Sequence, residues 1–175
     1  MKYHNITKAD MLNGEGLRVV LWVSGCSHHC PACQNAFTWD ENDGVNFDDD
    51  AINEIYKELE ADWCNGITLS GGDPLFLKNR KTIRDLVINI RTRYPEKTIW
   101  SYTGYTWEEL MEQLPNDEYL KDILENIDVL AEGRFVLSLA SVATHYVGST
   151  NQRIIDVPKS LKKDKIVIYK EKEDI

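Results

Sequence analysis

Long hydrophobic runs are missing from this chain of 175 residues. The longest, residues 19–23, is far shorter than the roughly 18 apolar residues that a helix needs to cross a bilayer. We therefore expect no membrane partner. No apolar stretch follows the N-terminus, so we also expect no signal peptide and a cytoplasmic location.

Positive charge is scarce as well, since 20 Lys and Arg residues stand against 29 Asp and Glu residues and leave a net charge of −9. Phosphate backbones are bound by basic surfaces, so no nucleic-acid partner is expected. The chain also lacks a P-loop, a Ser-His-Asp arrangement and a carboxylate pair placed for acid–base catalysis. With 42% hydrophobic and 28% charged residues and no repeat, the composition is typical of a soluble globular domain.

Cysteine is also rare, and its distribution is informative. Three of the 4 cysteines, Cys26, Cys30 and Cys33, lie within eight residues, while Cys64 is distant in sequence. In a reducing compartment, clustered thiols bind metals or take part in catalysis more often than they form disulfides. We interpret Cys64 as a small semi-buried residue without a role in this cluster.

The apolar pattern predicts strands that alternate with helices. Strands are predicted at residues 17–23, 66–69, 97–102 and 127–130, with a weaker candidate at 154–157. Helices are predicted after Asp48, around residues 83–90, and from a capping box that begins at Thr106. This alternation indicates an α/β fold with a parallel sheet. Because a full eight-stranded barrel takes about 250 residues, we expect a partial β/α barrel of parallel strands.

Two unusual segments each follow a predicted strand. One is the cysteine loop, residues 26–33, and the other is the Gly-Gly-Asp-Pro turn at residues 71–74. The carboxyl ends of parallel strands meet at one edge of a sheet, so the two segments should share one rim. Paired glycines allow the close approach of a ligand, and the carboxylate of Asp73 is suited to binding an ammonium group.

The spacing Cys26-x3-Cys30-x2-Cys33 leaves three interpretations open. A structural zinc site needs a fourth ligand from His28, His29 or Cys64, although we expect both histidines to be exposed loop residues. A dithiol redox site made of Cys30 and Cys33 leaves Cys26 unexplained. A 4Fe–4S cluster with three protein ligands leaves one iron open for a further ligand, and the nearby turn at residues 71–74 favours this interpretation.

Several segments together resemble the radical S-adenosylmethionine enzymes and, among them, the family that activates anaerobic ribonucleoside-triphosphate reductases. The matching segments are residues 13–18 (NGEGLR), 23–26 (VSGC), 30–35 (CPACQN), 38–39 (TW), 69–75 (LSGGDPL), 99–105 (IWSYTGY) and 148–153 (GSTNQR). The last two are not general to the superfamily and therefore favour this member of it. The resemblance extends from about residue 3 to residue 156.

This resemblance implies a set of site residues. Cys26, Cys30 and Cys33 would hold three irons of a 4Fe–4S cluster, and the fourth iron would bind the amino and carboxylate groups of S-adenosylmethionine. The residues implied to contact this cofactor are Ala32, Cys33, Gln34, Gly71, Gly72 and Asp73, with Asp73 facing the ammonium group.

The resemblance also implies an oxidoreductase reaction and a protein substrate. The reduced cluster would donate one electron to the sulfonium, and cleavage of the C–S bond would yield methionine and a 5′-deoxyadenosyl radical. That radical would take hydrogen from a glycine in the glycyl radical loop of the large reductase subunit. The expected partners are this subunit, with a possible dimer in the complex, and a one-electron donor such as a flavodoxin.

The chain departs from the usual family pattern at a few positions. The family usually has Pro at Glu15, Gly at Ala32, Tyr at Gln34 and Arg at Val147, and none of these changes removes a cluster ligand. Residues 1–157 are expected to form the activating domain, and residues 158–175 a C-terminal extension without a family counterpart. The alternatives are a radical enzyme acting on a small molecule, as in 7-deazapurine biosynthesis, and a non-catalytic zinc-stabilised module.

Overall fold

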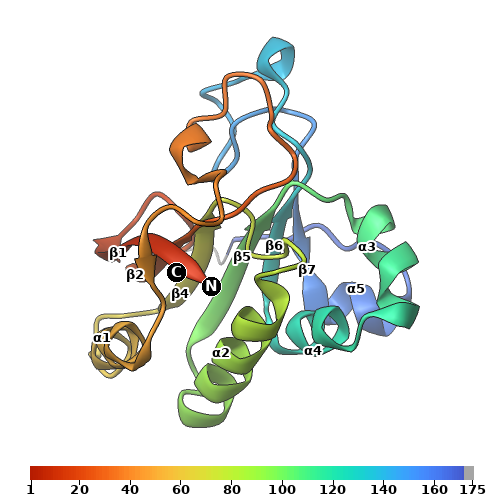
Figure 1. Cartoon of the computed structure of the whole chain (residues 1–175). Coiled ribbons are helices and arrows are strands. Elements are labelled where there is room, and N and C mark those ends of the chain that lie inside the picture. The colour runs from red at the N-terminus through yellow and green to blue at the C-terminus, as the bar shows by residue number, and fades with distance from the viewer. Residues whose placement is uncertain (172–175) are drawn as a thin grey trace.

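The computed structural model describes residues 1–171, which form a seven-stranded sheet covered by helices (Figure 1). The strand order is β3-β1-β2-β4-β5-β6-β7. The strands are β1 (Lys2–Asp10), β2 (Arg18–Val23), β3 (Val45–Asn46), β4 (Gly66–Gly71), β5 (Thr98–Thr103), β6 (Val129–Glu132) and β7 (Arg153–Asp156). The four central strands β2, β4, β5 and β6 are parallel. The protein is therefore a mixed α/β structure with a parallel centre.

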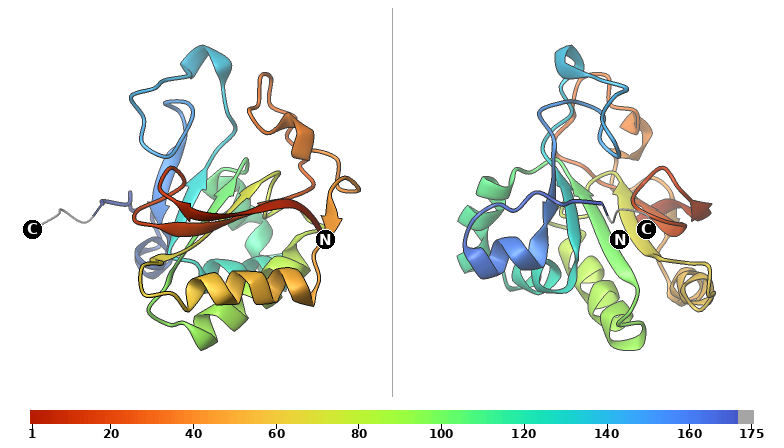
Figure 2. Two further views of the ribbon diagram at one scale, coloured as in Figure 1. Left: turned by 90° about the vertical axis from the view of Figure 1, so that its left-hand side faces the viewer. Right: turned by 180° about the vertical axis from the view of Figure 1, so that it is seen from behind.

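Five helices accompany the sheet, namely α1 (Asp49–Leu59), α2 (Arg80–Arg93), α3 (Trp107–Gln113), α4 (Glu118–Asn126) and α5 (Val157–Lys163), with short turns η1 (Ala36–Thr38), η2 (Leu114–Asn116) and η3 (Leu137–Leu139). Figure 2 shows the helices at one end of the molecule and two long loops, at residues 24–44 and 133–152, at the opposite end. No helix within residues 1–171 is long and apolar enough to cross a membrane.

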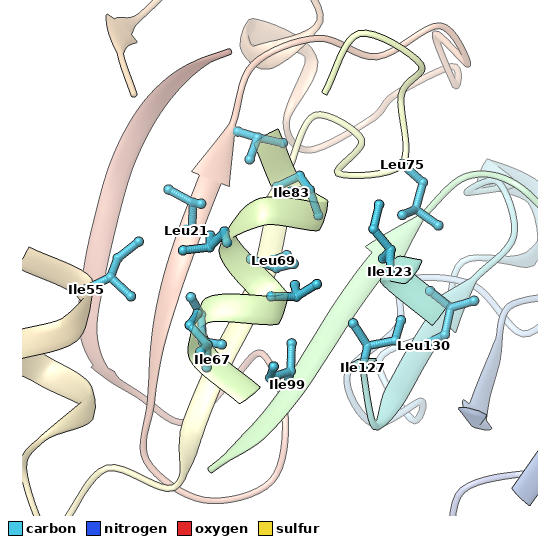
Figure 3. Close-up of a cluster of buried hydrophobic side chains, with 14 of the residues drawn as sticks. Leu21, Ile55, Ile67, Leu69, Leu75, Ile83, Ile99, Ile123, Ile127 and Leu130 are labelled. Atoms are coloured by element: carbon cyan, nitrogen blue, oxygen red, sulfur yellow. The ribbon is translucent and has the colours of Figure 1, made fainter. Parts of the chain in front are cut away.

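The hydrophobic core lies between the parallel strands and helices α1, α2 and α4. Leu21, Ile67 and Leu69 of the sheet are fully buried in one cluster with Ile55 of α1 and Ile83 of α2 (Figure 3). Strands covered on both faces carry nearly continuous apolar runs, and each such side chain contributes about 1.5–3 kcal/mol when fully buried. These runs explain why the central strands were predictable from sequence.

The predicted helix starts are confirmed by their caps. The Asp48 side chain accepts a hydrogen bond from the amide of Ala51 at 3.1 Å. Thr106 and Glu109 form the predicted capping box, with both reciprocal hydrogen bonds present. The predicted central helix is α2, whose C-cap Tyr94 lies directly before Pro95.

The expectation of an entirely parallel sheet is wrong at its edges. Strands β1 and β3 pair in antiparallel fashion, and so do β6 and β7. β7 runs back directly from the loop at residues 133–152 without a crossover helix, so it enters the sheet from the carboxyl end of β6 and must be antiparallel. β1 was not predicted because its side chains are mostly polar and only Ile6 is buried.

Part of the segment after residue 157 packs against β7. The amide of Asp156 donates to the carbonyl of Val167 at 2.9 Å, and that of Tyr169 donates to Ile154 at 2.8 Å. The Tyr169 hydroxyl also donates to the carboxylate of Glu15. Glu15, one of the departures from the family pattern, therefore contacts the C-terminal extension. Residues 172–175 of this extension lie outside the described residues.

Candidate functional site

The cysteine loop and the Gly-Gly-Asp-Pro turn lie side by side at the carboxyl edge of the sheet. Val23 at the end of β2 is paired in register with Gly71 at the end of β4. Beyond the strands, the amide of Gly72 donates to Val23 and that of Asp73 donates to Gly25, both at 2.8 Å. The two segments are therefore joined through their main chains.

The cysteine loop is closed at its base. The amide of Gly25 donates to Thr38 at 2.8 Å, and that of Cys26 donates to Trp39 at 3.1 Å. Within the loop, the amide of Cys33 donates to the carbonyl of Cys30 at 3.1 Å. The three thiols of Cys26, Cys30 and Cys33 are free and half-buried, so one closed loop carries all of them.

Cys64 is separate from this loop, as expected. It is 2% exposed and its thiol contacts the carbonyl of Gly66, where β4 begins. The cysteine loop adjoins the other end of β4. At roughly 3.3 Å per residue, a strand of this length separates its ends by about 17 Å. Cys64 is therefore too distant to act as a fourth ligand.

Two residues of the cysteine loop have left-handed backbone conformations without being glycine. His29 has φ 46° and Ala32 has φ 60°. This conformation costs about 1–2 kcal/mol for a residue with a Cβ atom, and such strain concentrates at functional sites. The Gly that the family usually has at position 32 would adopt this conformation without strain.

The two glycines of the turn allow close packing of the protein against itself. A Cβ atom on Gly71 would lie 2.7 Å from the main-chain nitrogen and oxygen of Val23, and one on Gly72 would lie 2.5 Å from the carbonyl oxygen of Gly25. On the side that a Cβ atom would occupy, the two glycines therefore contact the end of β2 and the start of the cysteine loop.

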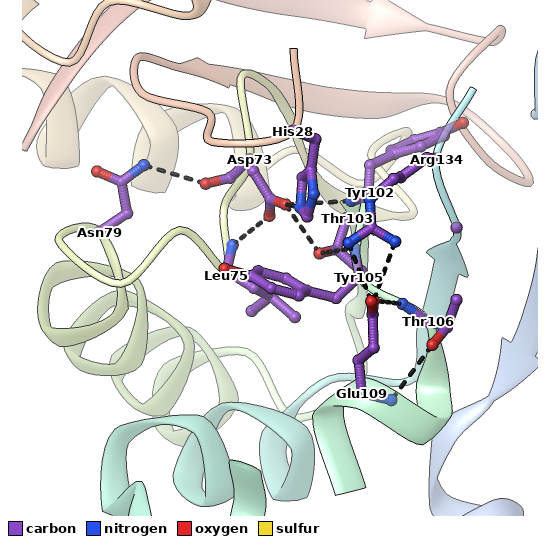
Figure 4. Close-up of polar contacts among 12 residues, drawn as sticks. His28, Asp73, Leu75, Asn79, Tyr102, Thr103, Tyr105, Thr106, Glu109 and Arg134 are labelled. Carbon is purple, nitrogen blue, oxygen red and sulfur yellow. Dashed lines mark hydrogen bonds and ion pairs between the residues drawn. The ribbon is translucent and has the colours of Figure 1, made fainter. Parts of the chain in front are cut away.

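The carboxylate of Asp73 is enclosed by protein donors (Figure 4). The residue is 1% exposed. Its Oδ1 accepts from the amide of Leu75 at 2.7 Å. Its Oδ2 accepts from the Thr103 hydroxyl at 3.0 Å and the Gly104 amide at 3.1 Å, and it lies 2.8 Å from Nε2 of His28. In this arrangement the carboxylate holds the cysteine loop to the end of β5 and is not presented to a ligand.

His28 is buried, which corrects the expectation that it is an exposed loop residue. Its side chain is 5% exposed and packs edge-to-face on Tyr105 with the ring centroids 4.5 Å apart. A Cβ atom on Gly104 would lie only 2.3 Å from the His28 ring. His29 is exposed as expected, and its ring contacts Trp39. The burial of His28 could have been expected from Asp73, because a carboxylate on the same rim needs a hydrogen-bond partner when it is buried.

A cavity of about 560 Å³ lies beside the cysteine loop. This volume is within the usual range for small-molecule sites. The lining residues come from strands β2, β4 and β5 and from three connecting loops: Leu12, Asn13, Trp22, Cys33, Gln34, Asn35, Ser70, Tyr102, Phe135, Thr144, Tyr146, Val147, Gly148 and Gln152. Of the predicted site residues, Cys33 and Gln34 line it, whereas Gly71, Gly72 and Asp73 are not among the lining residues.

Burial changes the proton affinity of two groups at the site. It raises the pKa of the Cys26 thiol to about 11. It also raises the pKa of Tyr102 above the usual tyrosine value, and the Tyr102 hydroxyl donates to the carbonyl of Tyr146 at 2.5 Å. Both groups are therefore protonated at neutral pH unless an electropositive ligand binds nearby.

The donor set fits an iron–sulfur cluster. Thiolates favour iron–sulfur clusters and zinc over hard cations. Among residues 1–171, no three His, Cys, Asp or Glu side chains converge closely enough to hold a single metal ion. An iron–sulfur cluster is held by cysteine thiolates. The three free thiols on one closed loop are donors of that kind.

Comparison with known proteins first defines the class. The family model described as a 4Fe-4S single cluster domain matches residues 12–155. This match covers most of the chain and includes the cysteine loop, the turn at residues 71–74 and the cavity. It supports the iron–sulfur interpretation over the zinc and dithiol alternatives.

Curated relatives then define the family. The anaerobic ribonucleoside-triphosphate reductase-activating protein of Enterobacteria phage T4 is 38% identical over 154 residues, which are 88% of this chain and 93% of the relative. That of Vibrio cholerae is 36% identical over 88% of this chain and 97% of its own length. That of Escherichia coli K12 is 39% identical, with 87% and 96% covered. The chain belongs to the family of anaerobic ribonucleoside-triphosphate reductase-activating proteins, which confirms the resemblance seen in the sequence.

Proposed function

We propose that this protein is a radical S-adenosylmethionine enzyme that forms a glycyl radical on an anaerobic ribonucleotide reductase. The observation that carries the proposal is a closed loop with three free thiols beside a cavity of ligand size, in a chain whose relatives are named as activating proteins. The same assignment makes it an oxidoreductase with an iron–sulfur cofactor.

Cys26, Cys30 and Cys33 are the proposed cluster ligands. When bound there, a 4Fe–4S cluster with one open iron supplies the single electron that cleaves S-adenosylmethionine reductively. The protein contributes the three thiolates, and the loop closed by Thr38 and Trp39 holds them together. The left-handed conformation of Ala32 directs the chain between Cys30 and Cys33.

The cavity is the proposed site for S-adenosylmethionine. Cys33 and Gln34 form the wall next to the cluster loop, and Ser70 and Tyr102 at two strand ends provide hydroxyl groups. We retain Gly71 and Gly72 as main-chain elements near the methionine end. Asp73 takes a supporting role, because its carboxylate is already bound by four protein groups including His28.

The open sheet suits a substrate that is itself a polypeptide. We propose that it is an incomplete β/α barrel whose uncovered side admits the glycyl radical loop of the large reductase subunit. A cytoplasmic location, a one-electron donor such as a flavodoxin and a dimer in the complex with the reductase belong to the same proposal.

Anaerobic reconstitution tests this function. We expect about four irons and four sulfides per chain, 5′-deoxyadenosine after reduction with dithionite in the presence of S-adenosylmethionine, and a glycyl radical signal in electron paramagnetic resonance when the reductase is added. Cys26→Ala should abolish all three results, whereas Cys64→Ser is the matched control that preserves them. Stoichiometric zinc, or 5′-deoxyadenosine without any glycyl radical, would contradict the proposal.

A further inference from the structure

An uncharged face surrounds the mouth of the cavity. Residues 24–39 and residues 135–152 contain no Asp, Glu, Lys or Arg, although 28% of the whole chain is charged. These two segments make up most of the two long loops, residues 24–44 and 133–152, that stand at one end of the molecule (Figure 2). Charged residues are depleted at the centres of protein–protein interfaces, so this face has the composition of a contact surface.

Large apolar side chains are exposed on the same face. Leu137 is 59% exposed, Leu139 is 43% exposed and Val142 is completely exposed, all in the loop at residues 135–152. Phe37 in η1 is 60% exposed, and Leu12 at the cavity wall is 80% exposed. Single exposed apolar residues are ordinary, but a group of them on an uncharged surface indicates a binding site.

The loop that carries the leucines is held in place at its base. Oε1 of Gln152 accepts from the amides of Gly148 at 2.9 Å and Ser149 at 3.1 Å, while its Nε2 donates to the carbonyl of Gly133 at 2.9 Å. An antiparallel bridge joins Ala140 to Ser149. The apolar tip is thus presented by a fixed base, which reduces the entropy lost on binding.

We propose that this uncharged face is the docking surface for the reductase polypeptide, with Leu137, Leu139 and Val142 as its central contacts. This inference rests on the proposed function, because a glycine reaching the cavity from another chain must bring its flanking residues across this rim. Phe135 and Val147 of the loop line the same cavity as Cys33. Nucleic acids and anionic membranes require basic residues, and residues 24–39 and 135–152 contain no Lys or Arg.

Two exposed residues provide a matched comparison. Leu137 is 59% exposed on the proposed face, and Ile168 is 53% exposed in the C-terminal extension. We expect Leu137→Asp to weaken the binding of the purified reductase at least about tenfold, because docking would bury an unpaired carboxylate, and Ile168→Asp to leave it unchanged. Val142→Asp provides a second variant at a position where folding cannot depend on the side chain.

Binding is measured by sedimentation under anaerobic conditions, together with iron content and 5′-deoxyadenosine formation without the reductase. Both of these should be the same in Leu137→Asp and in the unaltered protein, because neither requires docking. If the unaltered protein forms the glycyl radical and both variants on the face still bind the reductase normally, the docking inference is wrong while the proposed function stands. If the unaltered protein forms no glycyl radical, the proposed function itself fails.

Two further measurements separate other occupants of the face. Loss of self-association in Leu137→Asp, with reductase binding intact, would assign the face to a second copy of the chain. Loss of binding to phosphatidylcholine vesicles, again with reductase binding intact, would assign it to a membrane. Either result would overturn the docking inference.

Discussion

Replacing His28 should loosen the cysteine loop, because this side chain joins the loop to the buried carboxylate of Asp73. In the unaltered protein Nε2 of His28 lies 2.8 Å from Oδ2 of Asp73. His28→Asn shortens the side chain so that it no longer reaches this oxygen. The substitution also removes the edge-to-face contact with Tyr105. Asp73 would keep its donors from Leu75, Thr103 and Gly104 but lose its only link to the cysteine loop's side chains.

The size of this effect follows from the two contacts. A hydrogen bond to a charged group contributes about 1.5–3 kcal/mol and an aromatic pair about 0.5–1.5 kcal/mol, so the free energy of unfolding should fall by about 2–4 kcal/mol. With a urea dependence of about 2 kcal/mol per molar, the unfolding midpoint of the apo-protein should fall by about 1–2 M.

His29→Asn is the matched control for this experiment. His29 is the adjacent residue in the same loop and is exposed, and asparagine tolerates its left-handed conformation. The substitution removes the exposed edge-to-face contact of the His29 ring with Trp39 but no hydrogen bond to a buried carboxylate, so we expect the free energy of unfolding to fall by about 0.5–1.5 kcal/mol, less than in His28→Asn. His28→Gln, which restores a donor of suitable length, should recover part of the lost stability.

The assays are urea unfolding of the apo-protein and the rate at which the reconstituted protein loses iron to a chelator. His28→Asn should lower the midpoint and accelerate iron loss clearly more than His29→Asn, because only His28 contacts Asp73. Equal midpoints and equal iron retention in the two variants would show that the contact with Asp73 does not stabilise the cysteine loop.

Three further predictions concern the loop and the cavity. Burial raises the pKa of Cys26 to about 11. Its alkylation by iodoacetamide in the apo-protein at pH 8 should therefore be roughly 100-fold slower than that of a cysteine with the ordinary pKa of about 8.5. Peptide mass spectrometry after timed labelling measures this rate, and an ordinary rate would contradict the prediction. Ala32→Gly should raise the thermal unfolding temperature by relieving about 1 kcal/mol of left-handed strain, measured by calorimetry, with unchanged iron content; a lower unfolding temperature would refute the argument. Burial raises the pKa of Tyr102, so the stability that this residue contributes is fully present below the unfolded pKa of about 10 and declines as the pH rises above that value. Tyr102→Phe should reduce the decline in the free energy of unfolding seen in alkaline urea titrations. An identical decline in both proteins would show that the Tyr102 hydroxyl is not the group responsible.

The sequence was informative where local chemistry decides the structure. Apolar runs predicted the central strands, and Asp48 and Thr106 marked the starts of α1 and α3. β1 was missed because edge strands bury few side chains, and only Ile6 of this strand is buried. The direction of β7 depends on the path of the preceding loop, which no residue pattern specifies.

The site was predictable in composition but not in its contacts. Placing the cysteine loop next to Gly71 followed from the rule that parallel strand ends meet. The roles of Gly72 and Asp73 depend on which atoms fill the space beside them, and this is set by packing between segments far apart in the sequence. His28 shows the same limit, since a loop histidine is usually exposed and only the position of Asp73 buries it.

The two loops around the cavity are fixed to the sheet by the same kind of device. In the cysteine loop, His28 contacts Asp73 beyond β4, and in the other loop Gln152 binds main-chain groups beside β6 and β7. Each is a polar contact at a strand end, independent of the hydrophobic core below. The relative placement of the thiols, the cavity and the apolar rim therefore depends on these polar side chains together with the main-chain hydrogen bonds at the strand ends, whereas the core holds the strands that carry them.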